Sequence, residues 1–276
     1  MTAHIDIAKK PGAAAGIAFL RRSPHGAGQP LVLLHGIGSN ARSFATLIAA
    51  LPPSVDVIAW DAPGYGASLP LGEAFPSPRD YAAALLKFLD ELDLDRIVLA
   101  GHSLGALLAG SFAVHYPARL AALALLSPAV GYRLGPAAPL TPALQARIDE
   151  IESLGASRFA AQRAAKLVHA PESKPAIVAA IREAMAAVNV SGYAQAVRAL
   201  GAGDLLADCS AIAAPALVAV GAEDTVTPPA NARAVFSALA RAVAFREIRG
   251  AGHALPQENP AAVAQLLSEL MEYVHA

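Results

Sequence analysis

The sequence has only one cysteine, Cys209, among its 276 residues. A single cysteine cannot form a disulfide within the chain, so disulfide-rich secreted folds are excluded and a reducing compartment is expected. The N-terminal residues also lack the basic stretch, followed by an apolar stretch, of a secretory signal. We therefore expect a cytoplasmic protein that is stabilised by its hydrophobic core.

Charged residues are scarce as well, at 16% of the sequence, and the formal net charge is −1. With no excess of positive charge, the chain has no basic face for nucleic acid and no polybasic anchor for a membrane. Hydrophobic residues make up 55% of the sequence, which is far from a disordered composition. We expect a globular protein that acts on a small molecule, with neither nucleic acid nor a membrane as partner; a homodimer remains open.

One uncharged run, residues 97–118, is long enough to span a bilayer. However, Pro117 lies near one end of the run, and the segment GHSLG (101–105) interrupts its middle. A buried strand followed by a buried helix produces the same pattern, and we adopt that interpretation.

Apolar runs typical of strands alternate with helix-like stretches in both terminal parts of the chain. The strands are expected at 16–21, 31–34, 55–60, 97–100, 120–126, 216–220 and 244–248. The helices are expected at 43–51, 78–92, 106–116, 230–240 and 260–274. This alternation predicts the α/β class, with a mostly parallel sheet covered by helices on both faces.

The alternation stops between residues 130 and 211. Amphipathic stretches replace it there, at 142–154, 157–167, 174–188 and 192–200. A block of this length is too large for an ordinary connection between strands. We therefore predict an α/β core formed by residues 1–129 and 212–276, with residues 130–211 inserted as a helical cap.

The segment GHSLG (101–105) lies between an expected strand and an expected helix. The pattern G-x-S-x-G at such a turn is typical of a nucleophilic serine, here Ser103. A turn this tight strains the serine backbone, and glycines on either side avoid a clash of β-carbons. In a chain with 21 glycines the pattern is weak by itself, so the other groups of a catalytic site must be found.

A base and an acid follow two late strands. His253 lies after the last expected strand, within RGAGHALP (249–256), and Asp224 follows the strand at 216–220. The carboxyl ends of parallel strands lie at one edge of a sheet, so both side chains can reach Ser103. The order Ser, Asp, His is that of a hydrolase triad, although Glu223 remains an alternative acid.

An oxyanion hole requires backbone amides that point at the developing negative charge. The amide of Leu104, directly after Ser103, is one candidate. The second is the amide of Ile37, in the glycine-containing loop HGIGSN (35–40). Further residues expected to form the substrate pocket flank these groups or lie on the cap: His35, Gly36, His102, Phe159, Tyr193 and Leu255.

The cap also carries apolar and cationic side chains. Its apolar helix positions, Ile148, Ile151 and Leu154, are expected to contribute with the aromatics to a closed, mostly apolar pocket. Its cations are expected to form a solvated face, although one turned inward could bind a substrate carboxylate: Arg147, Arg158, Arg163, Lys166 and Arg182.

Five segments together resemble the α/β-hydrolase superfamily over almost the whole chain. They are HGIG (35–38), DAPGYGAS (61–68), GHSLG (101–105), GAED (221–224) and GAGH (250–253). In size and cap position the chain is similar to 3-oxoadipate enol-lactonases, meta-cleavage-product hydrolases and small bacterial carboxylesterases. The resemblance implies a serine hydrolase without metal or other cofactor, which cleaves an ester or enol-lactone of a small acid through an acyl-enzyme. Asp61 lies in a structural turn of such proteins and is assigned no chemistry.

Some members of the superfamily fit less well than others. Haloalkane dehalogenases and epoxide hydrolases use an aspartate where this chain has Ser103. Carbon–carbon hydrolases of the meta-cleavage type usually carry tryptophan where this chain has Ala254. Carbon–carbon hydrolysis, acyl transfer and perhydrolysis nevertheless stay as alternatives. A non-catalytic protein that binds a small ligand on the same fold is the alternative from another class.

Overall fold

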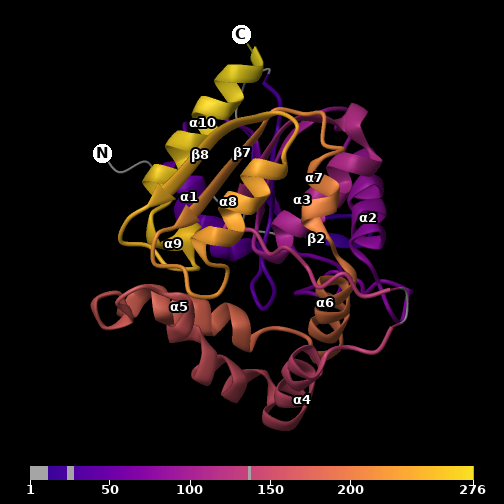
Figure 1. Ribbon diagram of the computed structural model, residues 1–276, viewed down its shortest axis with the longest axis vertical. Coiled ribbons are helices and arrows are strands. Elements are labelled where there is room, and N and C mark those ends of the chain that lie inside the picture. The colour runs from indigo at the N-terminus through magenta and orange to yellow at the C-terminus, as the bar shows by residue number, and fades with distance from the viewer. Residues whose placement is uncertain (1–11, 24–27, 136–137, 276) are drawn as a thin grey trace.

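The computed structural model describes residues 12–23, 28–135 and 138–275. Its strands form one eight-stranded sheet in the order β1-β2-β4-β3-β5-β6-β7-β8 (Figure 1). They are β1 (Gly12–Ala14), β2 (Ile17–Arg22), β3 (Leu31–Leu34), β4 (Val57–Trp60), β5 (Ile97–His102), β6 (Leu120–Leu126), β7 (Ala216–Gly221) and β8 (Ala242–Ile248). The first two strands are antiparallel to their neighbours, and every later pairing is parallel. The predicted α/β class with a mostly parallel sheet is confirmed.

Helices cover both faces of the sheet. They are α1 (Ala45–Ala50), α2 (Pro78–Glu91), α3 (Leu104–His115), α4 (Pro142–Arg163), α5 (Pro175–Ala186), α6 (Val190–Ala202), α7 (Leu205–Cys209), α8 (Pro229–Ala238), α9 (Leu255–Glu258) and α10 (Pro260–His275). On one face α1 packs against α10, and on the other α2, α3, α7 and α8 pack in sequence. Among the described residues, no helix is both long and apolar enough to cross a membrane.

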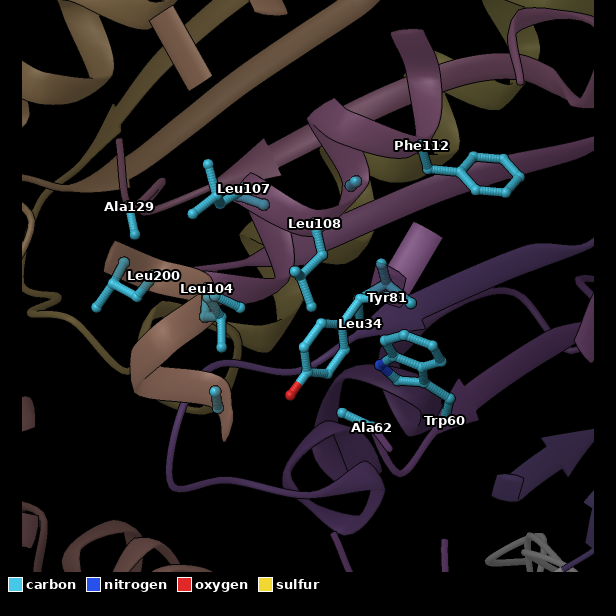
Figure 2. Packing of buried hydrophobic residues seen from close by; sticks show 14 of the residues in the cluster. Leu34, Trp60, Ala62, Tyr81, Leu104, Leu107, Leu108, Phe112, Ala129 and Leu200 are labelled. Carbon is cyan, nitrogen blue, oxygen red and sulfur yellow. The ribbon is translucent and has the colours of Figure 1, made fainter. Parts of the chain in front are cut away.

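The hydrophobic core has one part on each face because side chains alternate along a strand. In β3, Val32 and Leu34 contribute to the part under α3, while Leu31 and Leu33 contribute to the part under α10. Figure 2 shows residues of the first part, among them Leu34 from β3, Trp60 from β4, and Leu104, Leu107 and Leu108 from α3. All four residues of β3 are fully buried, as expected for an inner strand of a parallel sheet.

The segment between β6 and β7 is helical, and α4, α5 and α6 lie together at the lower end of the molecule in Figure 1. α4 packs against both α5 and α6. The two helices expected at 142–154 and 157–167 are both present: α4 consists of two helical parts that meet at a kink at Gly155, whose φ is +72°, and Ala164–Leu167 continue as a 3₁₀ turn. The short helix α7 packs against α3 and α8 instead. The boundaries of the cap at 130 and 211 stay a prediction.

The turn from β5 to α3 brings the backbones of strand and helix close together. Ser103 has φ +55° and ψ −115°, a backbone conformation that residues other than glycine rarely adopt. A β-carbon at Gly101 would collide with the carbonyl group of Gly105, and one at Gly105 would collide with the carbonyl oxygen of Leu34. Both glycines are therefore required for α3 to approach β5 and β3 so closely.

We predict that Gly105→Ala destabilises the protein by at least about 2 kcal/mol, because the new methyl group meets backbone that cannot move aside. Gly72→Ala is the matched control, since a β-carbon there has no neighbour within 4 Å. We expect the control to stay within about 0.5 kcal/mol of wild type. Urea unfolding of both variants measures the difference, and equal stabilities would contradict this account of the turn.

Candidate active site

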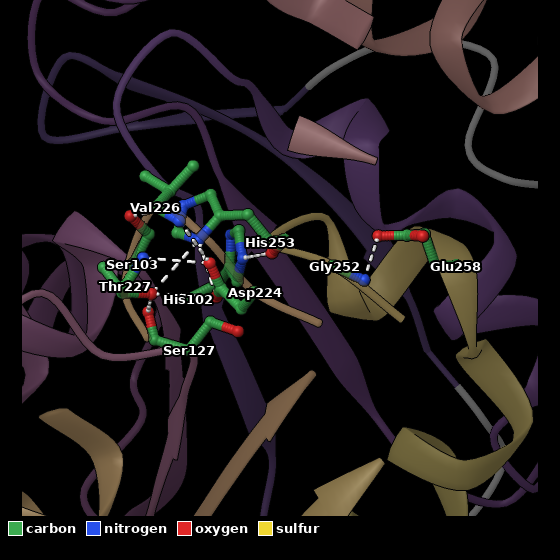
Figure 3. A network of polar contacts seen from close by, with 9 residues as sticks. All are labelled: His102, Ser103, Ser127, Asp224, Val226, Thr227, Gly252, His253 and Glu258. Carbon is green, nitrogen blue, oxygen red and sulfur yellow. Dashed lines mark hydrogen bonds and ion pairs between the residues drawn. The ribbon is translucent and has the colours of Figure 1, made fainter. Parts of the chain in front are cut away.

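Three side chains from distant parts of the sequence form a chain of hydrogen bonds (Figure 3). The Oγ atom of Ser103 lies 3.0 Å from Nε2 of His253, and Nδ1 of His253 lies 2.9 Å from Oδ2 of Asp224. All three side chains are buried. Ser103 follows β5, Asp224 follows β7 and His253 follows β8, so the carboxyl edge of the sheet brings them together.

The carboxylate of Asp224 is held by its own loop. Oδ1 accepts hydrogen bonds from the amides of Val226 at 2.8 Å and Thr227 at 2.9 Å. Burial raises the pKa of Asp224, but the hydrogen bond from His253 and the two amides outweigh it and lower the pKa to about 2. The carboxylate therefore stays ionised beside the imidazole at neutral pH.

The neighbouring acid, Glu223, points elsewhere. Its carboxylate accepts a hydrogen bond from the amide of Ala251 at 3.1 Å, so it supports the histidine loop and not the ring. Of the two acids that the sequence offers, the structure places Asp224 against His253.

Thr227 also contributes to this hydrogen-bond network, although it was not predicted from the sequence. Its Oγ1 lies 2.9 Å from Oδ2 of Asp224, 2.9 Å from the carbonyl oxygen of Ser127 and 3.1 Å from Nδ1 of His253. The hydroxyl thus helps to orient both the acid and the ring. A threonine three residues after a candidate acid is the only sequence signal, and it is weak.

The two amides expected to form an oxyanion hole lie beside Ser103. Ile37 and Leu104 both line the same cavity as the Ser103 hydroxyl. Within the described residues, neither amide has a hydrogen-bond acceptor, whereas the next amide, that of Gly38, reaches the hydroxyl oxygen of Tyr65 at 3.4 Å. Two unpaired donors next to a candidate nucleophile are suited to bind an anionic oxygen.

Glu258 connects the loop that carries His253 to the helical segment between β6 and β7 through hydrogen bonds. Its carboxylate accepts hydrogen bonds from the amide of Gly252 at 2.8 Å, the amide of His169 at 2.9 Å and Nζ of Lys174 at 2.7 Å. Figure 3 shows the bond to Gly252, directly before His253. The sequence did not predict a role for this buried carboxylate, because its hydrogen-bond partners lie up to 89 residues away in the chain.

The predicted pocket residues fall into three groups. Phe159 and Tyr193 line a cavity of about 420 Å³ that opens on Ser103, and their rings meet edge to face with centroids 5.3 Å apart. Gly36 and His102 line a smaller cavity of about 30 Å³ that also borders Ser103. His35 and Leu255 line neither cavity.

The expectation for Leu255 and His35 is therefore corrected. Leu255 is fully buried in the part of the core under α10, because α9 begins there and turns the side chain away from the site. His35 is a structural residue: its Nε2 accepts the amide of Ala62 at 3.0 Å, and its Nδ1 donates to the carbonyl of Gly36 at 2.8 Å. Burial lowers its pKa, so the ring stays neutral.

The cap residues also differ from expectation. Arg147, Arg163 and Lys166 line the large cavity instead of belonging only to a solvated face. The expected solvated face is correct for Arg158 and Arg182, which are exposed. Of the apolar cap positions, Ile148 and Ile151 are buried in the core, and neither they nor Leu154 line the cavity. Helix periodicity predicted which positions are buried but not what each one faces.

The fold and the geometry of the site define an α/β hydrolase. Residues 31–266 match the alpha/beta hydrolase family, and the chain belongs to that family. The resemblance inferred from the five motifs is thereby confirmed.

Named relatives support a hydrolase. The (E)-2-((N-methylformamido)methylene)succinate hydrolase of Acinetobacter baylyi is 31% identical, over 72% of this chain and 74% of that protein. The 3-oxoadipate enol-lactonase 2 of the same organism is 28% identical, over 88% of each chain. A solved thermophilic esterase from Thermogutta terrifontis, with malate bound, has 26% identity and a TM-score of 0.82 over 94% of each chain. Some other matches span only about 38% of the curated relative.

His102 makes the stability of the protein sensitive to acid. Its Nε2 lies 2.7 Å from the carbonyl oxygen of His253. Burial, followed by the nearby charge of His253, lowers the pKa of His102 from 6.5 to about 3. Between these values the unfolded chain binds a proton that the folded protein does not, so stability falls as the pH decreases from 6.5 towards 3.

We predict that this ring alone removes about 2 kcal/mol of stability between pH 7 and pH 5. His102→Gln, which retains a side-chain hydrogen-bond donor but does not titrate, should remove that part of the pH dependence. Urea unfolding of both proteins at the two pH values measures it. An unchanged pH dependence in the variant would show that His102 is not the responsible group.

Proposed function

We propose that this protein is a cofactor-free serine hydrolase that cleaves a carboxylic ester or enol-lactone of a small acid through an acyl-enzyme. The observation that carries the proposal is the chain of hydrogen bonds from Ser103 through His253 to Asp224, at 3.0 and 2.9 Å, beside two unpaired backbone amides.

In the first step the Oγ atom of Ser103 attacks the substrate carbonyl while Nε2 of His253 takes the hydroxyl proton. The carbonyl oxygen becomes an oxyanion that the amides of Ile37 and Leu104 stabilise. Asp224 holds the ring in the required tautomer and balances the charge of the imidazolium. The carbon–oxygen bond to the leaving group then breaks, and His253 returns the proton to that oxygen.

In the second step a water molecule attacks the acyl-enzyme. His253 takes one proton from the water, the oxyanion forms again, and its collapse releases the acid and restores the Ser103 hydroxyl. The cavity of about 30 Å³ beside His102, Ser103 and His253 has room for one such water, which requires roughly 15 Å³.

The volume of the larger cavity supports the proposal of a small substrate. Its volume of about 420 Å³ lies near the lower end of the range for pockets that hold small molecules. Two relatives are named for a succinate and for 3-oxoadipate, which fits an ester or lactone of a small acid. Ala254 presents only a methyl group beside His253, which disfavours a carbon–carbon hydrolase that relies on tryptophan there.

Cys209 is unsuited to be the nucleophile. It is fully buried, and burial raises the pKa of its thiol to about 12. A thiol that stays protonated and reduced also fits the proposed cytoplasmic location. A small-molecule substrate is the partner that we propose.

We predict that Ser103→Ala lowers kcat/KM for 4-nitrophenyl acetate by about a thousandfold or more, because the covalent route disappears. The variant should keep its thermal stability within the small range expected for loss of one hydroxyl group. Rates of 4-nitrophenol release and a thermal unfolding curve provide the measurement. If a purified, folded variant retained most of the activity, Ser103 would not be the nucleophile.

The acid can be tested with a pair of adjacent variants. Asp224→Asn supports the wrong ring tautomer and removes the balancing charge, so kcat should fall by about three to four orders of magnitude. Glu223→Gln is the matched control, and we expect it to change kcat only a few-fold. Steady-state kinetics of the two variants distinguish the acids, and the reverse ranking would assign the role to Glu223.

A further inference from the structure

The large cavity beside Ser103 carries positive charge that is not balanced within its wall. Arg147, Arg163 and Lys166 line it, and none of the described lining residues is Asp or Glu. The rest of the wall is apolar or neutral, with Phe159 and Tyr193 among its members. A cavity with cations and no carboxylate favours an anionic ligand.

The three cations are not equivalent. Arg163 pairs with Glu150, which lies outside the wall, and its guanidinium stacks over the ring of Phe159 at 4.8 Å from the centroid. Lys166 is largely exposed to solvent. Neither residue therefore presents a desolvated charge that lacks a partner.

Arg147 is different. Its side chain is half-buried, and its Nε atom is buried with no hydrogen-bond partner among the described residues. No carboxylate of the described residues lies within ion-pair distance of it. Buried donors without an acceptor are rare in folded proteins. A guanidinium presents a planar set of donors that fits the two oxygens of a carboxylate.

We propose that Arg147 binds a carboxylate of the substrate, so that the preferred substrates are monoesters or lactones of dicarboxylic acids. This inference rests on the proposed function, because it assigns one end of the substrate to Ser103 and the other to the cap. The acyl carbonyl lies at Ser103 between the amides of Ile37 and Leu104, and the free carboxylate binds the guanidinium of Arg147 on the cavity wall.

The test uses substrates that differ only in charge. The 4-nitrophenyl monoesters of glutarate and adipate are compared with neutral esters in which an isopropyl group replaces the carboxylate. The variants are Arg147→Met, which keeps the apolar stem, and Arg147→Lys, which keeps the charge without the planar donors. Arg158→Met, an exposed arginine on the same helix, is the control. Thermal unfolding checks that each variant folds.

We expect wild type to prefer at least one monoester over its neutral partner by about ten- to a hundredfold in kcat/KM, the range for one hydrogen-bonded ion pair. Arg147→Met should abolish that preference, Arg147→Lys should restore part of it, and Arg158→Met should retain it. Equal rates for both members of each pair in wild type, or an unchanged preference in Arg147→Met, would overturn the inference.

Calorimetric titration of Ser103→Ala with the same four compounds separates this inference from the proposed function. If Ser103→Ala binds the monoesters more tightly than the neutral compounds, and Ser103→Ala/Arg147→Met does not, the carboxylate site is supported. If wild type then hydrolyses none of the compounds, the proposed function alone is contradicted. Hydrolysis of all four esters by wild type, with equal binding of charged and neutral compounds, would contradict the carboxylate site alone.

Discussion

The close contact of α3 with β5 and β3 determines where every other group of the site must lie. No side chain fits at Gly101 or Gly105, and Ser103 between them is held at φ +55°. A buried strand and a buried helix on either side supply the packing that maintains this strained turn. The β-carbon of Ser103 is therefore fixed at the end of β5, and the loops after β7 and β8 approach it from the same edge of the sheet.

The helical segment between β6 and β7 is joined by hydrogen bonds to the loop that carries His253. The amide of Ala254 donates to the carbonyl of Leu167 at 2.9 Å, directly after His253 in the chain. Glu258 adds bonds to the cap at His169 and Lys174. Movement of the cap would thus move the loop that carries His253. Because Arg147 also lies on this segment, the proposed carboxylate site and the position of the imidazole depend on the same helices.

Local sequence patterns, such as apolar runs and short loop motifs, were sufficient to predict most of the fold. The apolar runs predicted seven of the eight strands within about two residues, and only the three-residue β1 was missed. Ser103, Asp224 and His253 could be selected as a candidate triad because each follows a strand in a distinctive loop. Arg147 was expected on a solvated face, with an inward position for one of the cap cations as the alternative, because helix periodicity does not say what a half-buried side chain faces. Leu255 was placed wrongly because proximity in sequence to His253 says nothing about the direction of a side chain.

The central claim is that Ser103 forms an acyl-enzyme. Rapid acid quenching during the first turnover of a 4-nitrophenyl ester, followed by peptide mass spectrometry, tests it most directly. The account predicts a burst of about one 4-nitrophenol per protein molecule and an acyl group on the peptide that contains Ser103. Hydrolysis without a burst, with the Ser103 peptide unmodified at every quench time even when release of the acid is slowed, would contradict it.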